Sequence, residues 1–284
     1  MRRLERGEKA GESPVTGAVR AARSQGRPAV VPFLTGGYPS LERFWTALED
    51  LCESGADIIE IGAPFSDPVA DGPVVAAASQ KALDGGATLA YIVEGLKERD
   101  FATPMVLMSY ANPLAQYGWA RASGKTALER LADSLSILAS DLAETPVKGV
   151  IVPDVPFEEA GPFYEAFSAE GLCLIPLVGP NTDSARMALY KPMAGGYVYA
   201  VSVLGTTGVR EGLPKEAADT IRRAREVFSL PVALGFGIKD PAQLAALGAD
   251  PDAVIIGSAL LRHLGEGGSC RDFMRPWTQG RAQS

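Results

Sequence analysis

The sequence predicts an α/β fold in which a single domain forms a (β/α)8 barrel. Eight short apolar runs alternate with segments of helical periodicity, the pattern of a parallel sheet covered by helices. The length of 284 residues suits one barrel, since such barrels run to about 250 residues. An open doubly wound sheet is the alternative, but it rarely needs eight regular units.

A strand is predicted at each short run of mostly apolar residues, several of which are followed by Gly or Pro. The first run ends at Gly36-Gly37, and the fourth is followed by Pro153. In chain order, the predicted strands are residues 29–35, 58–61, 105–108, 149–152, 172–177, 197–202, 231–234 and 253–256.

A helix is predicted where apolar residues recur every three or four positions. Residues 41–54 carry such a stripe from Leu41 to Leu51, and Gly55 ends this helix. A short helix at 15–24 is expected to cover the floor of the barrel. The remaining predicted helices are residues 74–83, 89–98, 158–170, 214–227 and 241–247.

The barrel is assigned to residues 17–270, with a flexible polar lead-in at 1–16 and a C-terminal tail at 271–284. A leucine stripe within 119–147 indicates one further helix, for which the simplest interpretation is a packed outer helix. Its members are Leu128, Leu131, Leu135, Leu138 and Leu142.

Composition excludes several classes of function. The chain is 46% hydrophobic and 21% charged, as in an ordinary globular domain, and its net charge of −7 offers no basic field for nucleic acid or an acidic membrane surface. The N-terminal segment lacks the apolar core of a secretory signal, and no apolar run is long enough to span a membrane.

Cysteine and histidine usage argues against a metal site. The three cysteines, Cys52, Cys173 and Cys270, are far apart in the sequence, which indicates a reducing compartment such as the cytoplasm and no disulfide framework. His263 is the only histidine. A mechanism that needs a histidine base together with histidine metal ligands is therefore excluded.

The segment from Asp57 to Ala82 carries the most informative chemistry. Glu60 interrupts a run of isoleucines, and burial of an unpaired carboxylate costs several kcal/mol or raises its pKa. Glu60 is therefore either a satisfied structural partner or an acid/base group. A loop rich in Pro and Gly follows, and it presents Asp67 and Asp71.

Glycine turns follow the last three predicted strands, at Gly205 to Gly208, Gly235 to Gly237, and Gly257-Ser258. Backbone N–H groups at the carboxyl ends of barrel strands can bind a phosphate, and glycine allows the backbone to approach the anion closely. Each turn alone is ordinary, but three in succession predict a barrel of the phosphate-binding type.

The stretch E-I-G-A-P-F-S-D-P-V-A-D-G-P, beginning at Glu60, resembles the signature of the tryptophan synthase alpha chain family. The resemblance extends from Pro28 to His263 and implies a phosphate-binding TIM barrel. The implied reaction is the retro-aldol cleavage of indole-3-glycerol phosphate to indole and glyceraldehyde 3-phosphate. After Y-A-N-P-L-A-Q-Y-G, which ends at Gly118, this chain is longer than the family pattern, and residues 121–126 are the expected insertion.

The resemblance also implies site residues. Glu60 is the expected acid and base, and Asp71 is expected to accept a hydrogen bond from the indole N–H. Indole would lie against Phe33, Val75, Met108 and Tyr199, and Thr207 would steady the catalytic acid. The expected binding residues at the glycine turns are Gly208, Gly235, Gly237, Gly257 and Ser258.

The resemblance implies a partner as well. Phe65, Asp67, Asn112 and Pro156 match positions that the family uses to meet the beta chain, in an alpha2beta2 heterotetramer of tryptophan biosynthesis. No metal or cofactor is expected in this chain, and pyridoxal phosphate is expected on the beta partner.

Two alternatives remain open at this stage. Another phosphate-binding barrel enzyme is one, but an epimerase needs histidine ligands and an indoleglycerol-phosphate synthase needs lysines at strand ends, where this sequence has none. The other is a catalytically weak regulatory subunit that activates a beta chain. Replacement of Glu60 or Asp71 would favour it, and both residues are present.

Overall fold

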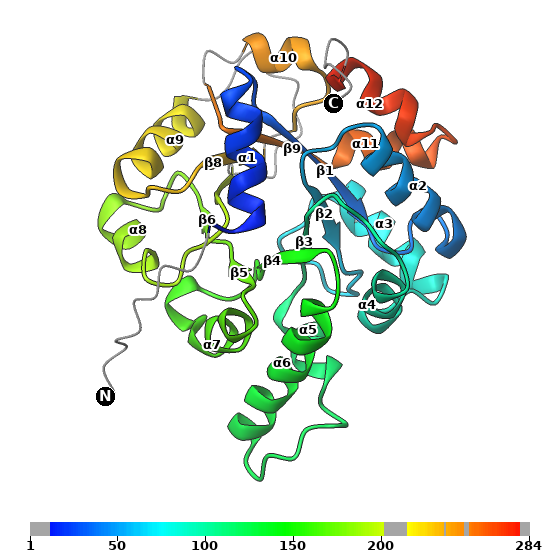
Figure 1. Cartoon of the computed structure of the whole chain (residues 1–284), viewed down its shortest axis with the longest axis vertical. Coiled ribbons are helices and arrows are strands. Elements are labelled where there is room, and N and C mark those ends of the chain that lie inside the picture. The colour runs from blue at the N-terminus through cyan, green and yellow to red at the C-terminus, as the bar shows by residue number, and fades with distance from the viewer. Residues whose placement is uncertain (1–11, 202–214, 236, 247–249, 279–284) are drawn as a thin grey trace.

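A computed structural model describes residues 12–201, 215–235, 237–246 and 250–278. Its parallel strands follow the order β5-β4-β3-β2-β1-β9-β8-β7-β6. Helices surround them in a ring (Figure 1). The single-domain barrel predicted from the sequence is confirmed.

The strands are almost entirely buried, as expected of parallel strands covered on both faces. They are β1 (Ala29–Thr35), β2 (Ile59–Gly62), β3 (Met105–Met108), β4 (Val147–Ile151), β5 (Cys173–Leu174), β6 (Leu177–Val178), β7 (Val198–Val201), β8 (Val232–Gly235) and β9 (Ala253–Ile256).

The prediction of one strand over residues 172–177 was wrong in one respect, because this segment forms two short strands, β5 and β6. β5 pairs with β4 and β6 pairs with β7, so this one segment joins the two ends of the sheet into a closed ring. Pro176 lies between the two pieces and has no N–H to donate, which interrupts the ladder. Its carbonyl still accepts from the Tyr199 N–H at 2.9 Å.

Most helices begin where a capping side chain precedes the apolar stripe, as at Ser40, Thr88, Thr126 and Asp183. The helical elements are α1 (Pro14–Ser24), α2 (Leu41–Glu53), α3 (Pro73–Asp84), α4 (Leu89–Lys97), α5 (Ala111–Tyr117), α6 (Ala127–Ala143), the 3₁₀ turn η1 (Phe157–Glu159), α7 (Gly161–Ala169), α8 (Ser184–Tyr190), α9 (Lys215–Val227), α10 (Pro241–Ala246), α11 (Ser258–Gly265) and α12 (Cys270–Thr278).

Several segments differ from the expected helices, and α5, α8 and α11 form where no helix was predicted. The helix predicted over 158–170 is divided into η1 and α7, because Pro162 in the first turn of α7 favours a new start. The residues expected to form a tail after 270 begin with α12, which buries Met274 and Trp277 and packs against α2.

The amino ends of the strands form one face, crossed by α1 as the sequence predicted (Figure 1). Val15, Val19 and Ala22 of α1 are buried. The Thr16 hydroxyl donates to the Gly196 carbonyl at 2.6 Å, which ties α1 to the segment before β7.

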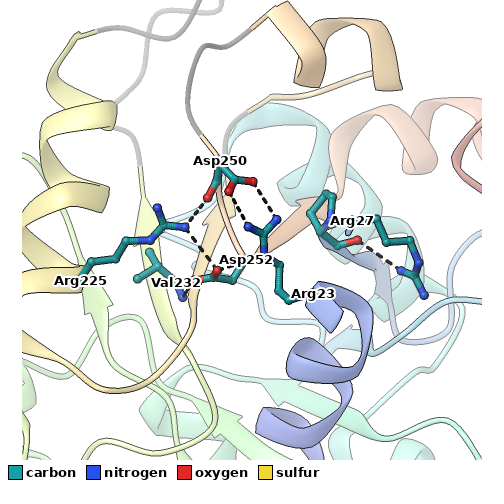
Figure 2. A network of polar contacts seen from close by, with 7 residues as sticks. Arg23, Arg27, Arg225, Val232, Asp250 and Asp252 are labelled. Atoms are coloured by element: carbon teal, nitrogen blue, oxygen red, sulfur yellow. Dashed lines mark hydrogen bonds and ion pairs between the residues drawn. The ribbon is translucent and has the colours of Figure 1, made fainter. Parts of the chain in front are cut away.

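Two aspartates at this face are paired with arginines. Asp252, just before β9, accepts from the Val232 N–H at 2.8 Å and lies 3.3 Å from Arg225 and 3.4 Å from Arg23. Figure 2 shows both arginines converging on Asp250 and Asp252. These contacts join α1, α9, β8 and β9 at the amino end of the barrel.

Asp57, just before β2, has the same arrangement. Its carboxylate accepts two hydrogen bonds from Arg27, at 2.7 and 2.8 Å, and one from the Val30 N–H at 2.8 Å. Bidentate Arg–carboxylate pairs of this kind are the strong, geometrically specific ones. At the amino end, Asp57 and Asp252 are therefore each held by arginine and by a backbone N–H.

Candidate active site

Glu60 lies at the centre of β2 with its side chain fully buried. Among the described residues, neither of its carboxylate oxygens has a hydrogen-bond partner. Burial, with a smaller contribution from the negative charge of Asp71, raises the pKa of Glu60 to about 8. The carboxyl group is therefore protonated at neutral pH and available as an acid.

Phe33 forms one wall beside Glu60. Strand pairing of β1 and β2 aligns Phe33 with Glu60, which gives both residues the same orientation relative to the sheet. The Phe33 ring lies over Gly62 and Gly257: a Cβ at Gly62 would lie 2.5 Å from Phe33 Cζ, and one at Gly257 would lie 3.3 Å from Phe33 Cδ1. The absence of a side chain at Gly62 makes room for the ring.

Two tyrosines of the β7 segment face the same interior. Burial first, and then the negative charge of Glu60, raises the pKa of both Tyr197 and Tyr199 well above the usual value. Their rings lie 6.3 Å apart, and Tyr199 packs on Gly235, where a Cβ would lie 2.5 Å from its hydroxyl. Tyr197 is fully buried, its hydroxyl has no hydrogen-bond partner in the part of the chain that the structure describes, and the sequence analysis missed it. Its spacing of two from Tyr199 could have revealed it.

Asp71 is held by a residue that the sequence analysis also missed. The Tyr110 hydroxyl donates to Asp71 Oδ2 at 3.1 Å and accepts from the Ala70 N–H at 3.0 Å. Burial raises the pKa of Asp71 to about 6, and the hydrogen bond from Tyr110 opposes that rise. Tyr110 is the N-cap residue of α5, so its backbone position is fixed by the start of that helix.

The other residues expected around indole lie at strand and helix ends near this interior. Met108 is the last residue of β3 and pairs with Gly62, while Val75 lies in the first turn of α3. Both are half-buried, so part of each side chain is available to a ligand.

The expected phosphate-binding residues are described in part. Gly235 ends β8, and Gly257 precedes the first turn of α11, which begins at Ser258. β8 and β9 are neighbours, so these turns lie at the same edge. Gly237 has φ of +33°, and Gly257 makes no side-chain cap, which leaves the first N–H groups of α11 free of a capping side chain. Thr207 and Gly208 lie outside the described residues.

The four residues expected to meet a partner follow β2, β3 and β4, which are consecutive in the sheet: Phe65, Asp67 and Pro156 lie in loops and Asn112 lies in the first turn of α5. Asp67, Asn112 and Pro156 are exposed and Phe65 is half-buried. The Phe65 ring lies 5.1 Å from that of Tyr110, which holds Asp71. This surface is thus linked directly to the candidate site.

Within the described ranges, no group of three or more His, Cys, Asp and Glu side chains is placed to hold a metal. In the same part of the chain, no helix combines the length and apolar character needed to cross a membrane. The fold and the candidate site define the class of barrel enzyme, and two carboxyl groups of raised pKa, Glu60 and Asp71, lie at the site.

Comparison with known proteins supplies the family. The model of the family described as "Tryptophan synthase alpha chain" matches residues 19–275. The chain therefore belongs to the tryptophan synthase alpha chain family. This family provides the lyase subunit that cleaves indole-3-glycerol phosphate in tryptophan biosynthesis, and its members carry no cofactor, since pyridoxal phosphate belongs to the beta subunit.

Relatives and solved structures agree with this assignment. The alpha chain of Nitratidesulfovibrio vulgaris (strain DP4) is 54% identical over 263 residues, covering 92% of this chain and 96% of the relative. That of Desulfovibrio desulfuricans is 52% identical and covers 91% and 97%. The tryptophan synthase structure from Mycobacterium tuberculosis has a TM-score of 0.81 at 31% identity, covering 94% of this chain and 96% of that one. The tryptophan synthase complex from Pyrococcus furiosus has a TM-score of 0.71 at 32% identity, covering 87% and 94%.

Proposed function

We propose that Glu60 and Asp71 carry out the retro-aldol cleavage of indole-3-glycerol phosphate in this chain. The observation that carries the proposal is the fully buried Glu60 carboxyl, which has no hydrogen-bond partner among the described residues and a pKa of about 8. A carboxyl group that is protonated at neutral pH and has no hydrogen-bond partner among the described residues is suited to donate a proton to substrate.

The reaction needs two proton transfers. Glu60 donates its proton to indole C3, and the positive charge that develops on the ring is stabilised by the Asp71 carboxylate, which accepts from the indole N–H. The bond between C3 and the glycerol chain then breaks and its electron pair returns to the ring. The adjacent hydroxyl gives its proton to the Glu60 carboxylate as the aldehyde forms, so the acid is regenerated.

The pKa order of the two carboxyl groups supports this division of roles. Asp71, with a pKa of about 6, is mostly ionised at pH 7, whereas Glu60, with a pKa of about 8, is mostly protonated. Asp71 has a donor from Tyr110 and Glu60 has none among the described residues. At neutral pH the site therefore holds one ionised carboxylate, Asp71, and one protonated carboxyl group, Glu60.

Indole is proposed to bind between Phe33, Val75, Met108 and Tyr199, with the phosphate at Gly208, Gly235, Gly237, Gly257 and Ser258, and Thr207 steadying Glu60. The half-buried side chains of Val75, Met108 and Tyr199, and a start of α11 at which Gly257 provides no capping side chain, support this orientation. The substrate would then span the barrel from β1 and β2 to β8 and β9.

The proposed partner is a tryptophan synthase beta chain, in an alpha2beta2 heterotetramer that works in the cytoplasm. Phe65, Asp67, Asn112 and Pro156 would contact it. The solved complex from P. furiosus and the three free cysteines, which suit a reducing compartment, support this proposal.

The test is release of indole from indole-3-glycerol phosphate by the purified chain, alone and with a beta chain. Glu60→Gln and Glu159→Gln form a matched pair, since Glu159 is an exposed glutamate outside the site. We expect Glu60→Gln to abolish indole release and Glu159→Gln to leave it unchanged. A wild-type chain that stimulates the beta chain yet releases no indole would instead favour the regulatory-subunit alternative.

A further inference from the structure

The segment between α5 and the second turn of α6, residues 118–132, has no role in the proposed reaction. It contains the stretch in which the sequence departs from the family pattern, and we refer to it as the α5–α6 projection. In Figure 1, α6 and the loop before it extend beyond the ring of outer helices. The question is what the exposed surface of this projection binds.

The projection is held in one shape by polar contacts. The Ser123 N–H and hydroxyl donate to Asp133 Oδ2 at 3.1 and 3.0 Å, and Thr126 and Glu129 form a capping box at the start of α6. Arg130 donates to the Trp119 carbonyl at 3.0 Å and lies 4.9 Å from its ring. A surface that is ordered before binding loses less conformational entropy when a partner docks.

The projection also exposes apolar surface. Among the described residues, the exposed large hydrophobic side chains are Val69, Leu128 and Leu189, at 83, 67 and 63%. Leu128 lies in the first turn of α6, and Ala132, one turn later on the same face, is also exposed. Single exposed leucines are ordinary, so the position of Leu128 matters more than its exposure.

That position is connected to the proposed partner surface through α5, because Asn112, one of the four expected partner residues, lies in the first turn of α5, and α5 packs on α6. Val69 lies in the loop after β2, next to Ala70, whose N–H donates to the Tyr110 hydroxyl. Tyr110 caps α5, which leads directly into the projection and packs on α6. Because α5 leaves the carboxyl end of β3 and α6 returns to the start of β4, the first turn of α6 lies on the side of the carboxyl ends.

We propose that the α5–α6 projection is a second contact surface for the beta chain, with Leu128 as its apolar anchor. This inference rests on the proposed partner, and the docked partner would cover Val69 and Leu128 together. A second copy of this chain is the competing occupant, because an apolar anchor could equally pair with itself across a two-fold axis.

The experiment measures the dissociation constant between this chain and its cognate beta chain for wild type, Leu128→Glu and Ala132→Glu. Leu189→Glu is the matched control, since it makes the same chemical change at a similarly exposed leucine in the last turn of α8. Asp67→Ala reports on the partner surface itself. Each variant is also assayed alone for indole release, and the wild-type chain is examined alone by sedimentation.

We expect Leu128→Glu to weaken binding of the beta chain by about tenfold or more. Ala132→Glu should weaken it less, Leu189→Glu should leave it unchanged, and indole release by the isolated chain should be unaltered. If Leu128→Glu binds the beta chain as tightly as wild type while Asp67→Ala binds it more weakly, the inference about the α5–α6 projection is wrong. The proposed partner would not be affected by that result. Self-association that Leu128→Glu abolishes would overturn it in favour of a second copy. Failure of the wild-type chain to bind any beta chain would remove both proposals.

Discussion

The two ends of the barrel treat carboxyl groups in opposite ways. At the amino end, Asp57 and Asp252 each receive an arginine and a backbone N–H. At the interior reached from the carboxyl end, Glu60 has no donor among the described residues and Asp71 has one from Tyr110. Asp57 lies just before β2 and Glu60 lies within it, so the two are close in the sequence and the difference arises from their surroundings.

The fold therefore stabilises ionised carboxylates at the amino end and leaves the Glu60 carboxylate unstabilised in the interior. A carboxylate with an arginine and an N–H donor stays ionised and joins elements, whereas a buried carboxyl without donors keeps its proton at neutral pH. The first arrangement suits stability and the second suits proton transfer. Substitutions at the two ends should therefore separate activity from stability.

The largest expected effect is on activity. Glu60→Gln keeps the shape of the side chain but removes the transferable proton, and kcat should fall by about a thousandfold with little change in affinity for a substrate analogue. Steady-state release of indole and analogue titration provide the measurement. Activity within about tenfold of wild type would refute the catalytic role of Glu60.

The same substitution should stabilise the fold at alkaline pH. The folded-state pKa of Glu60 is about 8 against an ordinary value of 4.5, so the folded chain holds a proton that the unfolded chain has lost, and wild-type stability falls as pH rises between these values. Glu60→Gln avoids this loss and should gain on the order of 3 kcal/mol by pH 8. The measurement is the free energy of unfolding of wild type and Glu60→Gln in urea at pH 5 and pH 8. A difference between the two proteins that is the same at both pH values would contradict the titration argument.

At the amino end the expectation is reversed. Asp252→Asn weakens the contacts with Arg23 and Arg225, and it should lower the free energy of unfolding by about 2 kcal/mol while kcat stays unchanged. Asp250→Asn is the control: its side chain is 68% exposed, so its loss should matter less. A large fall in kcat for a folded Asp252→Asn chain would show that the two ends are coupled.

The smallest expected effect is on the pH dependence of kcat/KM. Ionised Asp71 and protonated Glu60 predict a bell with limbs near pH 6 and pH 8. Because the Tyr110 hydrogen bond lowers the Asp71 pKa, Tyr110→Phe should move the acidic limb upward by less than about 1 pH unit. Tyr117→Phe is the matched control, since Tyr117 donates to Asp141 at 3.0 Å outside the site. An acidic limb that moves downward in Tyr110→Phe would contradict the role given to this bond.

Local sequence patterns determined much of the fold. The predicted strands 29–35, 105–108 and 253–256 are confirmed with the same bounds, because short apolar runs between turn residues have few other conformations available in a barrel. Glu60 was identified for a similar reason: a lone carboxyl in an isoleucine run stands out without any knowledge of its neighbours. The structure confirms that this carboxyl is fully buried in a strand.

Other features were decided only by tertiary structure, since they join residues that are distant in the chain. Tyr110 meets Asp71 across 39 positions, and Arg23 meets Asp250 across 227, so neither pair leaves a local signal. The division of the fifth strand likewise reflects two different neighbours, β4 and β7, competing for one short segment around Pro176. Sequence alone determined which groups could carry charge in this protein. Which of those charges is compensated depends on the donors that folding brings to them, because the free energy of a buried carboxylate is set by its surroundings.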